Sequence, residues 1–373
     1  MYRPSLRSIW TLLILAALCV GLYAWSERSH VESKLPYYNE KVAAAKLMDH
    51  ALRTLQDATM EKGDFTNEAY PDPRLTAIIG QQFSLITTDF DVFETKLIGA
   101  NPNFAAAVVD LLKQADVQSG DFVAVGCTGS QPGANIAVLC ACEALGAIPV
   151  TITAIGSSWW GANDPEMTWP DMERVLDEQG IVHSRAIAAS MGGAGDKAFG
   201  LSKIGQDLIR TAAERNHLPL VLEENLHTSV TRRMELYGAA AKGHAYKAFV
   251  TVGQGEADLG HSANAGLIGW GYQSKLPAKN YPARGVAHLF NDQNVPVINL
   301  SDVAAVSREY GLGGPQIPLP EVGEGDAYIT ERYDLRVAGI SALIALALIL
   351  ILVRLDAKLF RLKEAGVDPD TLM

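Results

Sequence analysis

A glycine-rich string is the part of this chain whose residue types are best suited to chemistry. It reads Gly126-Cys127-Thr128-Gly129-Ser130-Gln131-Pro132-Gly133 and stands between an apolar run and a helical run. Glycines let a backbone turn tightly and approach a ligand closely. Backbone amides at the start of a helix favour an anion, and two hydroxyls add hydrogen-bond donors. The string predicts a loop that binds an anionic or carboxylate group, with a tight turn for packing alone as the alternative.

Three side chains of this loop are candidate catalytic nucleophiles, namely Ser130, Thr128 and Cys127. A thiol near a helix N-terminus has a lowered pKa, but each of the three needs a base within hydrogen-bond reach. The sequence places no histidine beside the loop. The G-x-S-x-G elbow of serine hydrolases is absent, as are the Walker and dinucleotide-binding spacings. A small, packed cysteine is the alternative for Cys127.

Three further segments are expected beside this loop, because each follows a predicted strand of the same sheet. They are 156–164, 191–197 and 253–258, and each contains glycine. The carboxyl ends of parallel strands meet at one edge of a sheet, where ligands bind. We therefore predict a ligand-binding cleft formed by Gly126, Thr128, Gly129, Ser130, Trp159, Trp160, Asn163, Gly192, Gly193, Glu223 and Gln254.

Two parts of the predicted cleft have plainer alternatives. Trp159 and Trp160 either line it or form a hydrophobic plug beneath the loop. Glu223 and Glu224 end a predicted strand, where they hold an amine, act as acid and base, or are solvated charges. No metal and no cofactor is predicted, because the histidines and cysteines lack metal-ligand spacing.

The elements that must position these turns alternate regularly. Short apolar strands are predicted over 122–126, 149–155, 184–189, 218–222, 248–252 and 296–300. Helices are predicted over 134–147, 172–179, 201–215 and 229–241, and Ser301 and Asp302 are placed to cap another. This alternation favours a parallel sheet covered on both faces. The predicted fold class is α/β, with a doubly wound, mostly parallel sheet.

Two uncharged apolar segments, 9–25 and 337–353, bracket the predicted sheet. Each is about long enough to cross a bilayer as a helix. Basic residues lie outside both segments, at Arg3, Arg7, Arg354, Lys358, Arg361 and Lys363. Since Lys and Arg stay cytoplasmic, we expect a two-pass protein of the cell membrane with both termini inside and the main domain extracytoplasmic. A cleaved signal peptide is the alternative for the first segment.

The predicted layout follows from these segments. Residues 1–8 form a cytoplasmic N-terminus, 9–25 a transmembrane helix, and 27–70 a helical stalk with a rough apolar stripe. An extracytoplasmic α/β domain spans 71–312. A linker rich in Pro and Gly covers 313–335, the second transmembrane helix 337–353, and a cytoplasmic tail 354–373.

Composition sets limits on partners and on covalent structure. Hydrophobic residues make up 48% of the 373 residues, which allows a sizeable core. The net charge of −11 does not steer nucleic acid or anionic lipid towards the chain. Of the four cysteines, Cys127, Cys140 and Cys142 lie outside the apolar segments. This odd number implies a free thiol or an intermolecular bond rather than a disulfide scaffold.

Two strings carry a resemblance to a known family. They are the run 120–126 (GDFVAVG) with Thr128-Gly129-Ser130, and the run 158–166 (SWWGANDPE). With these strings and its two apolar segments, the chain resembles the poly-gamma-glutamate system protein family. These membrane proteins are associated with the machinery that makes and exports poly-gamma-glutamate. The likeness covers most of the chain, and no active-site residues are carried over from the family.

The resemblance implies an accessory role beside the ligase and its membrane partner, in the synthesis or export of this anionic polymer. Implied partners are the bilayer, the other proteins of the system, and the polymer or a small carboxylate. Cationic helpers for such a ligand are Lys197, Lys203, Arg232 and Arg233. Two alternatives remain: an extracytoplasmic hydrolase or γ-glutamyl transferase using a nucleophile of the glycine-rich loop, and a small-acid receptor.

Overall fold

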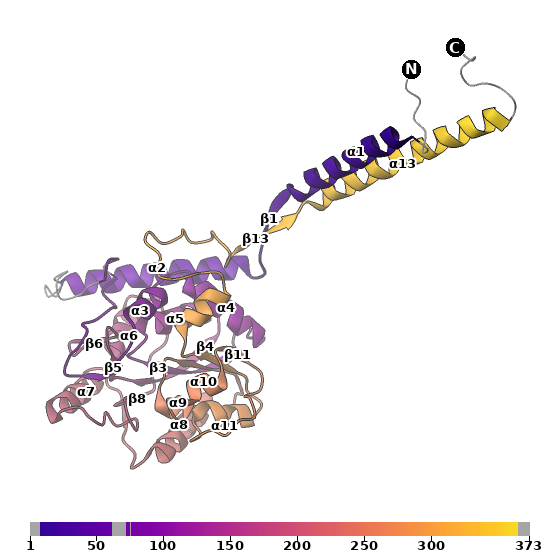
Figure 1. The fold of residues 1–373 in the computed structure, drawn as a ribbon. Helices are drawn as coiled ribbons and strands as arrows, with labels where there is room; N and C mark the ends of the chain where they lie inside the picture. The colour runs from indigo at the N-terminus through magenta and orange to yellow at the C-terminus, as the bar shows by residue number, and fades with distance from the viewer. Residues whose placement is uncertain (1–7, 62–71, 75, 365–373) are drawn as a thin grey trace. The chain divides into compact units, whose positions relative to one another are not determined.

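The computed structural model describes residues 8–61, 72–74 and 76–364 (Figure 1). Of the predicted cytoplasmic ends, residues 1–7 and 365–373 therefore lie outside the described residues. Contacts within the chain divide it into two compact units. One unit combines Met1–Lys34 with Ile329–Met373, and the other is Leu35–Tyr328.

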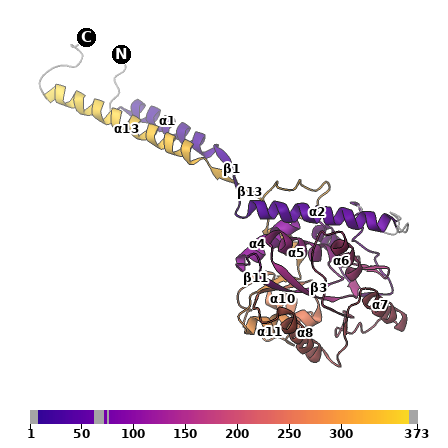
Figure 2. The ribbon, with the colours of Figure 1, turned by 180° about the vertical axis from the view of Figure 1, so that it is seen from behind.

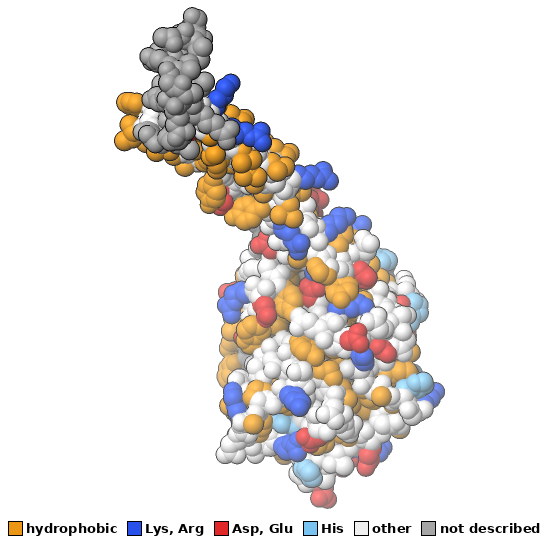
Figure 3. Space-filling model, turned by 90° about the vertical axis from the view of Figure 1, so that its right-hand side faces the viewer, with side chains coloured by type: hydrophobic (Ala, Val, Ile, Leu, Met, Phe, Trp, Pro, Cys, Tyr) orange, Lys and Arg blue, Asp and Glu red, His pale blue; other side chains and the backbone are white. Residues whose placement is uncertain are grey.

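The terminal unit is a pair of helices joined to a two-stranded ribbon. It contains α1 (Ile9–Glu27), β1 (His30–Lys34), β13 (Ile329–Tyr333) and α13 (Leu335–Glu364). β1 pairs antiparallel with β13, so both helices leave the same end of the ribbon. Both are long and apolar enough to cross a membrane. Their apolar side chains are largely exposed (Figure 3), as a bilayer-facing surface requires.

The larger unit is a mixed α/β domain built on a seven-stranded, mostly parallel sheet. The strand order is β11-β12-β10-β3-β4-β8-β9. Six strands are parallel, whereas β11 pairs antiparallel with β12 at one edge. The strands are β3 (Phe122–Thr128), β4 (Ile148–Ala154), β8 (Ala188–Ser190), β9 (Leu220–Val221), β10 (Tyr246–Val252), β11 (Gly271–Gln273) and β12 (Val297–Leu300).

Helices lie on both sides of this sheet (Figures 1 and 2). One group is α2 (Tyr38–Glu61), α4 (Phe104–Gln114), α5 (Pro132–Leu145) and α6 (Trp169–Glu178). α8 (Leu226–Ala241) and α11 (Val286–Asp292) cover the other side. The remaining helices are α3 (Phe93–Gly99), α7 (Lys203–Arg215), α9 (Glu256–Leu259), α10 (Asn264–Ile268) and α12 (Val303–Glu309).

Two small ribbons accompany the main sheet. β2 (Thr87–Asp89) pairs parallel with β5 (Ser157–Ser158), and β6 (Asn163–Asp164) pairs antiparallel with β7 (Met167–Thr168). The first of these ribbons joins a segment that precedes the sheet in sequence to the turn after β4. It therefore brings residues about 70 positions apart to the same edge of the sheet.

An aromatic core fixes α8 against the sheet. The ring of Tyr237 lies 5.5 Å from that of Phe290, which stacks on Phe249 at 5.0 Å between centroids. The Tyr237 hydroxyl donates a hydrogen bond of 2.8 Å to the Val125 carbonyl of β3. Since Arg233 stands one turn before Tyr237, it shares the face of α8 that meets the sheet.

The structure corrects the prediction of a stalk over 27–70. The helix is present as α2, but it packs on α4, α5 and α6 rather than standing apart. Residues 62–70 of the predicted stalk lie outside the described residues. Its stripe is buried because Met48, Leu52 and Leu55 are core residues. Lys41 is buried too, and its Nζ contacts Asp110 Oδ2 at 2.6 Å and the Ala327 carbonyl at 3.0 Å. The domain therefore begins at Leu35 rather than at residue 71.

The structure also corrects the C-terminal end of the linker predicted over 313–335. Tyr328 is fully buried in the domain, and its hydroxyl donates a 2.7 Å hydrogen bond to Asn103 Oδ1. Residues 329–333 form β13 rather than a loop. The third predicted strand, 184–189, is shifted to 188–190. In its early part the Ala186 N–H donates to the buried Glu173 carboxylate at 2.9 Å rather than to a neighbouring strand.

Candidate functional site

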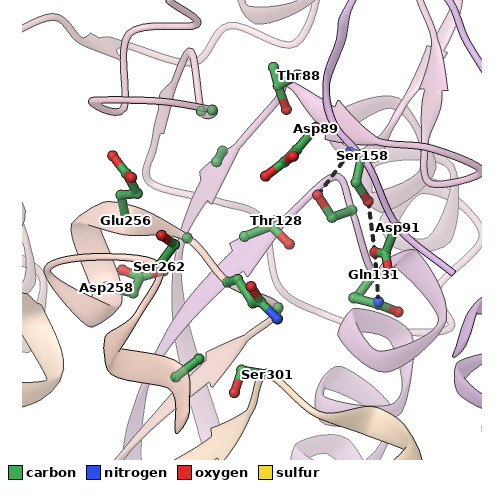
Figure 4. A pocket seen from close by; sticks show the side chains of 18 of the residues that line it. Thr88, Asp89, Asp91, Thr128, Gln131, Ser158, Glu256, Asp258, Ser262 and Ser301 are labelled. Carbon is green, nitrogen blue, oxygen red and sulfur yellow. Dashed lines mark hydrogen bonds between the residues drawn. The ribbon is translucent and has the colours of Figure 1, made fainter. Parts of the chain in front are cut away.

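A pocket of about 760 Å³ lies at the carboxyl edge of the parallel strands (Figure 4). The turns that follow β3, β4, β8, β10 and β12 all contribute to its wall. A further wall comes from 88–92 and Thr95, at β2 and the start of α3. Volumes of this size are typical of small-molecule sites.

The pocket brings together five of the residues predicted from the sequence. Thr128 and Ser130 line it after β3, Gly192 and Gly193 after β8, and Gln254 after β10. Asn135 of α5 holds the first of these turns, since its Nδ2 donates to the Thr128 carbonyl at 2.8 Å. Pro132 begins α5 directly after the loop, as expected at the first helical position. Three turns distant in sequence thus share one cavity.

The other predicted members have different places in the described structure. Asn163 is buried, and its Nδ2 donates to the Gln81 carbonyl at 2.7 Å, which is a structural role. The Trp159 ring packs against Phe90 and Trp160 at 4.9 and 5.3 Å, beside the pocket rather than in its wall. The remaining three, Gly126, Gly129 and Glu223, do not line the described pocket either.

Gly126 nevertheless serves the site indirectly. A Cβ atom at this position would collide with the Asp258 carboxylate. The missing side chain therefore lets an acidic group pack directly against β3. Asp258 is 2% exposed and lines the pocket.

Cys127 is not a reactive thiol in this structure. Its side chain is fully buried, and burial raises its pKa well above the usual value, with Glu173 adding to the effect. A buried thiol of raised pKa is a poor nucleophile. The structure therefore corrects the candidate role of Cys127 in catalysis: this side chain packs in the core. All four cysteines are free.

A buried charge network forms one wall of the pocket. Arg233 of α8 is 1% exposed, and its Nη2 contacts Asp196 Oδ2 at 3.1 Å and Ser190 Oγ at 2.7 Å. Asp196 also accepts hydrogen bonds from Ser190 and from Ser229, at 2.6 and 2.7 Å. The second carboxylate, Asp258, lies 3.5 Å from Arg233 Nη1. One guanidinium thus stands between two carboxylates.

Several atoms of this wall have no hydrogen-bond partner in the described structure. They are Asp258 Oδ1, Thr128 Oγ1, Arg233 Nε and Arg233 Nη1. Burial raises the pKa of Asp258 to about 6, although Arg233 lowers it. Unsatisfied buried polar atoms are costly. Here they include both acceptors and donors, side by side on one wall.

A second polar cluster lies across the pocket, at the β2–β5 ribbon. Asp91 Oδ2 accepts hydrogen bonds from Ser158 Oγ at 2.9 Å and from Gln131 Nε2 at 3.3 Å (Figure 4). It also pairs with the buried Lys96 ammonium, which contacts the Ser130 carbonyl as well. Lys96 Nζ lies 3.0 Å from Ser158 Oγ. Burial lowers the pKa of Lys96 to about 8, although Asp91 raises it.

The pocket wall is strongly acidic. Among the described residues, one guanidinium and six carboxylates line it, the latter from Asp89, Asp91, Asp196, Glu256, Asp258 and Asp302. Glu256 reaches across to the turn after β8, where it accepts the Gly195 N–H at 2.6 Å. In the same described part of the chain, no three His, Cys, Asp or Glu side chains form a group suited to a metal ion.

Comparisons with models of known protein families, with curated proteins and with solved structures find no match.

Sequence reasoning missed the acidic wall of the site. Asp89 and Asp91 precede the sheet and follow none of its predicted strands. Asp258 and Glu256 stand in the predicted turn 253–258, where their charge is visible although their inward placement is not. Arg233 was expected only as a helper for a carboxylate, whereas it is a buried member of the wall. Of the other predicted helpers, Lys197 donates to the Glu224 carbonyl, and Lys203 pairs with Asp207 on α7.

Proposed function

We propose that this chain is a membrane-anchored accessory component of poly-gamma-glutamate synthesis or export. Its pocket binds a small ligand that carries both an ammonium and a carboxylate group, such as an amino acid or the amino-terminal unit of the polymer. The observation that carries the ligand assignment is the wall formed by Asp258, Thr128 and Arg233. In that wall Asp258 Oδ1, Thr128 Oγ1 and Arg233 Nη1 have no hydrogen-bond partner in the described structure, and the first and last of these atoms form an ion pair at 3.5 Å.

The charge of the pocket favours an ammonium group over a lone carboxylate. Six carboxylates face one guanidinium among its described lining residues, so a purely anionic ligand meets repulsion. Asp258 Oδ1 and Thr128 Oγ1 are acceptors for an ammonium, and Arg233 Nη1 is a donor for a carboxylate. This pattern argues against a receptor for a simple acid. In a γ-linked polymer only the terminal unit keeps a free ammonium, which makes that end the group recognised.

The proposed topology is two-pass, with both termini cytoplasmic and the α/β domain outside. Supporting it, α1 and α13 leave the same end of the β1–β13 ribbon, so both helices run towards one side. Basic residues lie near the C-terminal end of α13, and such residues favour the cytoplasmic side of a membrane. Protease added to intact cells is expected to cut within Leu35–Tyr328. Cleavage only after lysis would contradict the topology.

We also propose that the sheet is doubly wound. β4, β8 and β9 extend from one side of β3, whereas β10 and β12 extend from the other. The direction of winding then changes between β3 and β10, whose following turns supply Thr128 and Gln254 to the pocket. Ligands of open α/β sheets bind at such a change of direction.

The ligand assignment is tested by calorimetric titration of the full chain in nanodiscs. The probes are L-glutamate and glutarate, which keeps the carbon chain and both carboxylates but lacks the ammonium. We expect saturable heat with glutamate and none with glutarate. Equal binding of both, or heat with neither, would overturn the assignment.

The accessory role is tested in cells that make the polymer. We expect polymer at the cell surface to fall when either apolar helix is removed or when Asp258→Asn replaces the wild type. Cys127→Ala, which keeps a small packed residue, should leave the amount of polymer unchanged. Unaltered polymer in the helix-deletion and Asp258→Asn cells would count against the role.

A further inference from the structure

We propose that the pocket also carries an acyl-transfer activity in which Ser158 is the nucleophile and Lys96 is its base. The substrate class is an amide or ester of a small acyl group. This activity goes beyond ligand binding, and it uses a serine outside the glycine-rich loop. The contacts around Lys96 Nζ support this assignment.

The β2–β5 ribbon places the two groups together. Ser158 ends β5, directly opposite Asp89 of β2, and the chain after β2 leads into α3, which carries Lys96. Lys96 Nζ then lies 3.0 Å from Ser158 Oγ. Lys96 is 3% exposed and does not line the pocket, whereas Ser158 does. The serine therefore separates a buried amine from the open cavity.

The hydrogen-bond partners of Lys96 Nζ determine what a neutral Lys96 amine could do. A neutral amine has two N–H donors and one lone pair. The Asp91 carboxylate and the Ser130 carbonyl accept the two donors. As an ammonium, Lys96 donates its third N–H to Ser158 Oγ at 3.0 Å, and the Ser158 hydroxyl donates to Asp91 Oδ2 at 2.9 Å. Loss of that third proton leaves the lone pair facing Ser158 Oγ, and rotation of the hydroxyl from Asp91 to Nζ gives the arrangement that a base needs to activate a serine. Burial, which lowers the pKa of Lys96 to about 8, makes the neutral amine accessible near neutral pH.

The reaction balances with these groups alone. The Ser158 proton passes to Lys96 Nζ while Oγ forms a C–O bond to the substrate carbonyl carbon. The C–N or C–O bond to the leaving group breaks, and Lys96 returns the proton to that group. Water or an acceptor amine then cleaves the acyl-serine ester and restores the hydroxyl. Ser130 Oγ, which accepts the Ser158 N–H at 3.0 Å, has a proton to donate to the developing oxyanion.

The other candidate nucleophiles lack such a base. Thr128 Oγ1 has no hydrogen-bond partner in the described structure, and Cys127 is buried outside the pocket wall. Lys96 contacts the backbone carbonyl of Ser130 rather than its hydroxyl. Ser158 is thus the serine of the pocket that contacts an amine.

The test uses an alkyl fluorophosphonate on the full chain in detergent, with the labelled peptide found by mass spectrometry. Its P–F bond is replaced by a P–O bond to the activated serine. We expect labelling of Ser158 that rises with pH through about 8, as Lys96 loses its proton. Asp91 is the titratable group that contacts Lys96.

Variants separate chemistry from folding. Ser158→Ala should abolish labelling, whereas Ser119→Ala, at an exposed serine before β3 that does not line the pocket, should leave it unchanged. Lys96→Gln and Lys96→Arg should each slow labelling by about a hundredfold or more, with the folded state checked by thermal melting. No labelling of the wild type at any pH, or equal labelling of Ser158→Ala, would overturn the proposal. Glutamate binding by Ser158→Ala reports on the ligand assignment separately.

Discussion

Arg233 Nη1 and Asp258 Oδ1 lie 3.5 Å apart, and neither atom has a hydrogen-bond partner in the described structure. The separation is close enough for charge attraction but too long for a good hydrogen bond. On its other side Arg233 is held by Asp196 at 3.1 Å. The result is a buried group of one cation and two anions in which some hydrogen-bonding capacity is unfilled.

Removing the cation of this group should be costly. Arg233→Met leaves Asp196 and Asp258 buried without their counter-charge, and we expect a loss of about 3–5 kcal/mol in the free energy of unfolding. Arg232→Met is the matched control, because Arg232 is exposed and pairs with Glu235 on the surface. Its effect should stay below about 1 kcal/mol. Chemical denaturation of both variants checks the difference, and similar losses would contradict a buried network.

Ligand binding should depend on pH through Asp258. Burial raises the pKa of this carboxyl from 3.8 to about 6. An ammonium ligand needs the ionised carboxylate, so affinity should be full above this pKa and fall as the pH drops below it. Calorimetric titration with L-glutamate at a series of pH values measures this. Affinity that rises towards acid pH would show that the protonated form binds.

The thiols of the domain should be inert while it is folded. Burial raises the pKa values of Cys127 and Cys140 strongly and that of Cys142 to about 12. Iodoacetamide at neutral pH should therefore leave all three unmodified in the native protein and alkylate them after denaturation. Mass spectrometry gives the answer for each site. Rapid alkylation of native Cys127 would restore it as a candidate nucleophile.

The packing of α2 on the domain predicts a stability effect. Leu55→Ala removes a fully buried side chain and should cost about 2–5 kcal/mol. Arg53→Ala, on the exposed side of the same helix, should cost less than about 1 kcal/mol. Denaturation curves of the two variants distinguish a packed helix from a free stalk, for which both changes would be mild.

The parallel sheet could be predicted from the sequence because its signal is local. β3 and β10 are short apolar runs, each followed by a glycine-bearing turn, and a strand covered on both faces requires such a run. The burial of α2 could not be predicted in this way. An apolar stripe such as that of Met48, Leu52 and Leu55 suits a stalk that pairs with another helix as well as a helix that packs on its own domain.

The site was predictable only in part, for a similar reason. Thr128 and Gln254 follow strands of one sheet, so their shared edge follows from topology. Asp91 reaches the pocket through the pairing of β2 with β5, which joins segments that share no local pattern. The contact between Arg233 and Asp258 likewise depends on how α8 packs, which Tyr237 and its neighbours in the core determine.

The most direct test of the account is the affinity of Asp258→Asn for L-glutamate, measured by calorimetric titration beside Asp207→Asn. Asp207 is an exposed acid on α7, so its replacement makes the same chemical change away from the pocket. Loss of a charged hydrogen bond to an ammonium should weaken binding by about tenfold or more in Asp258→Asn. Asp207→Asn should bind as the wild type does. Equal affinity of both variants would contradict an amine-binding pocket at this edge of the sheet.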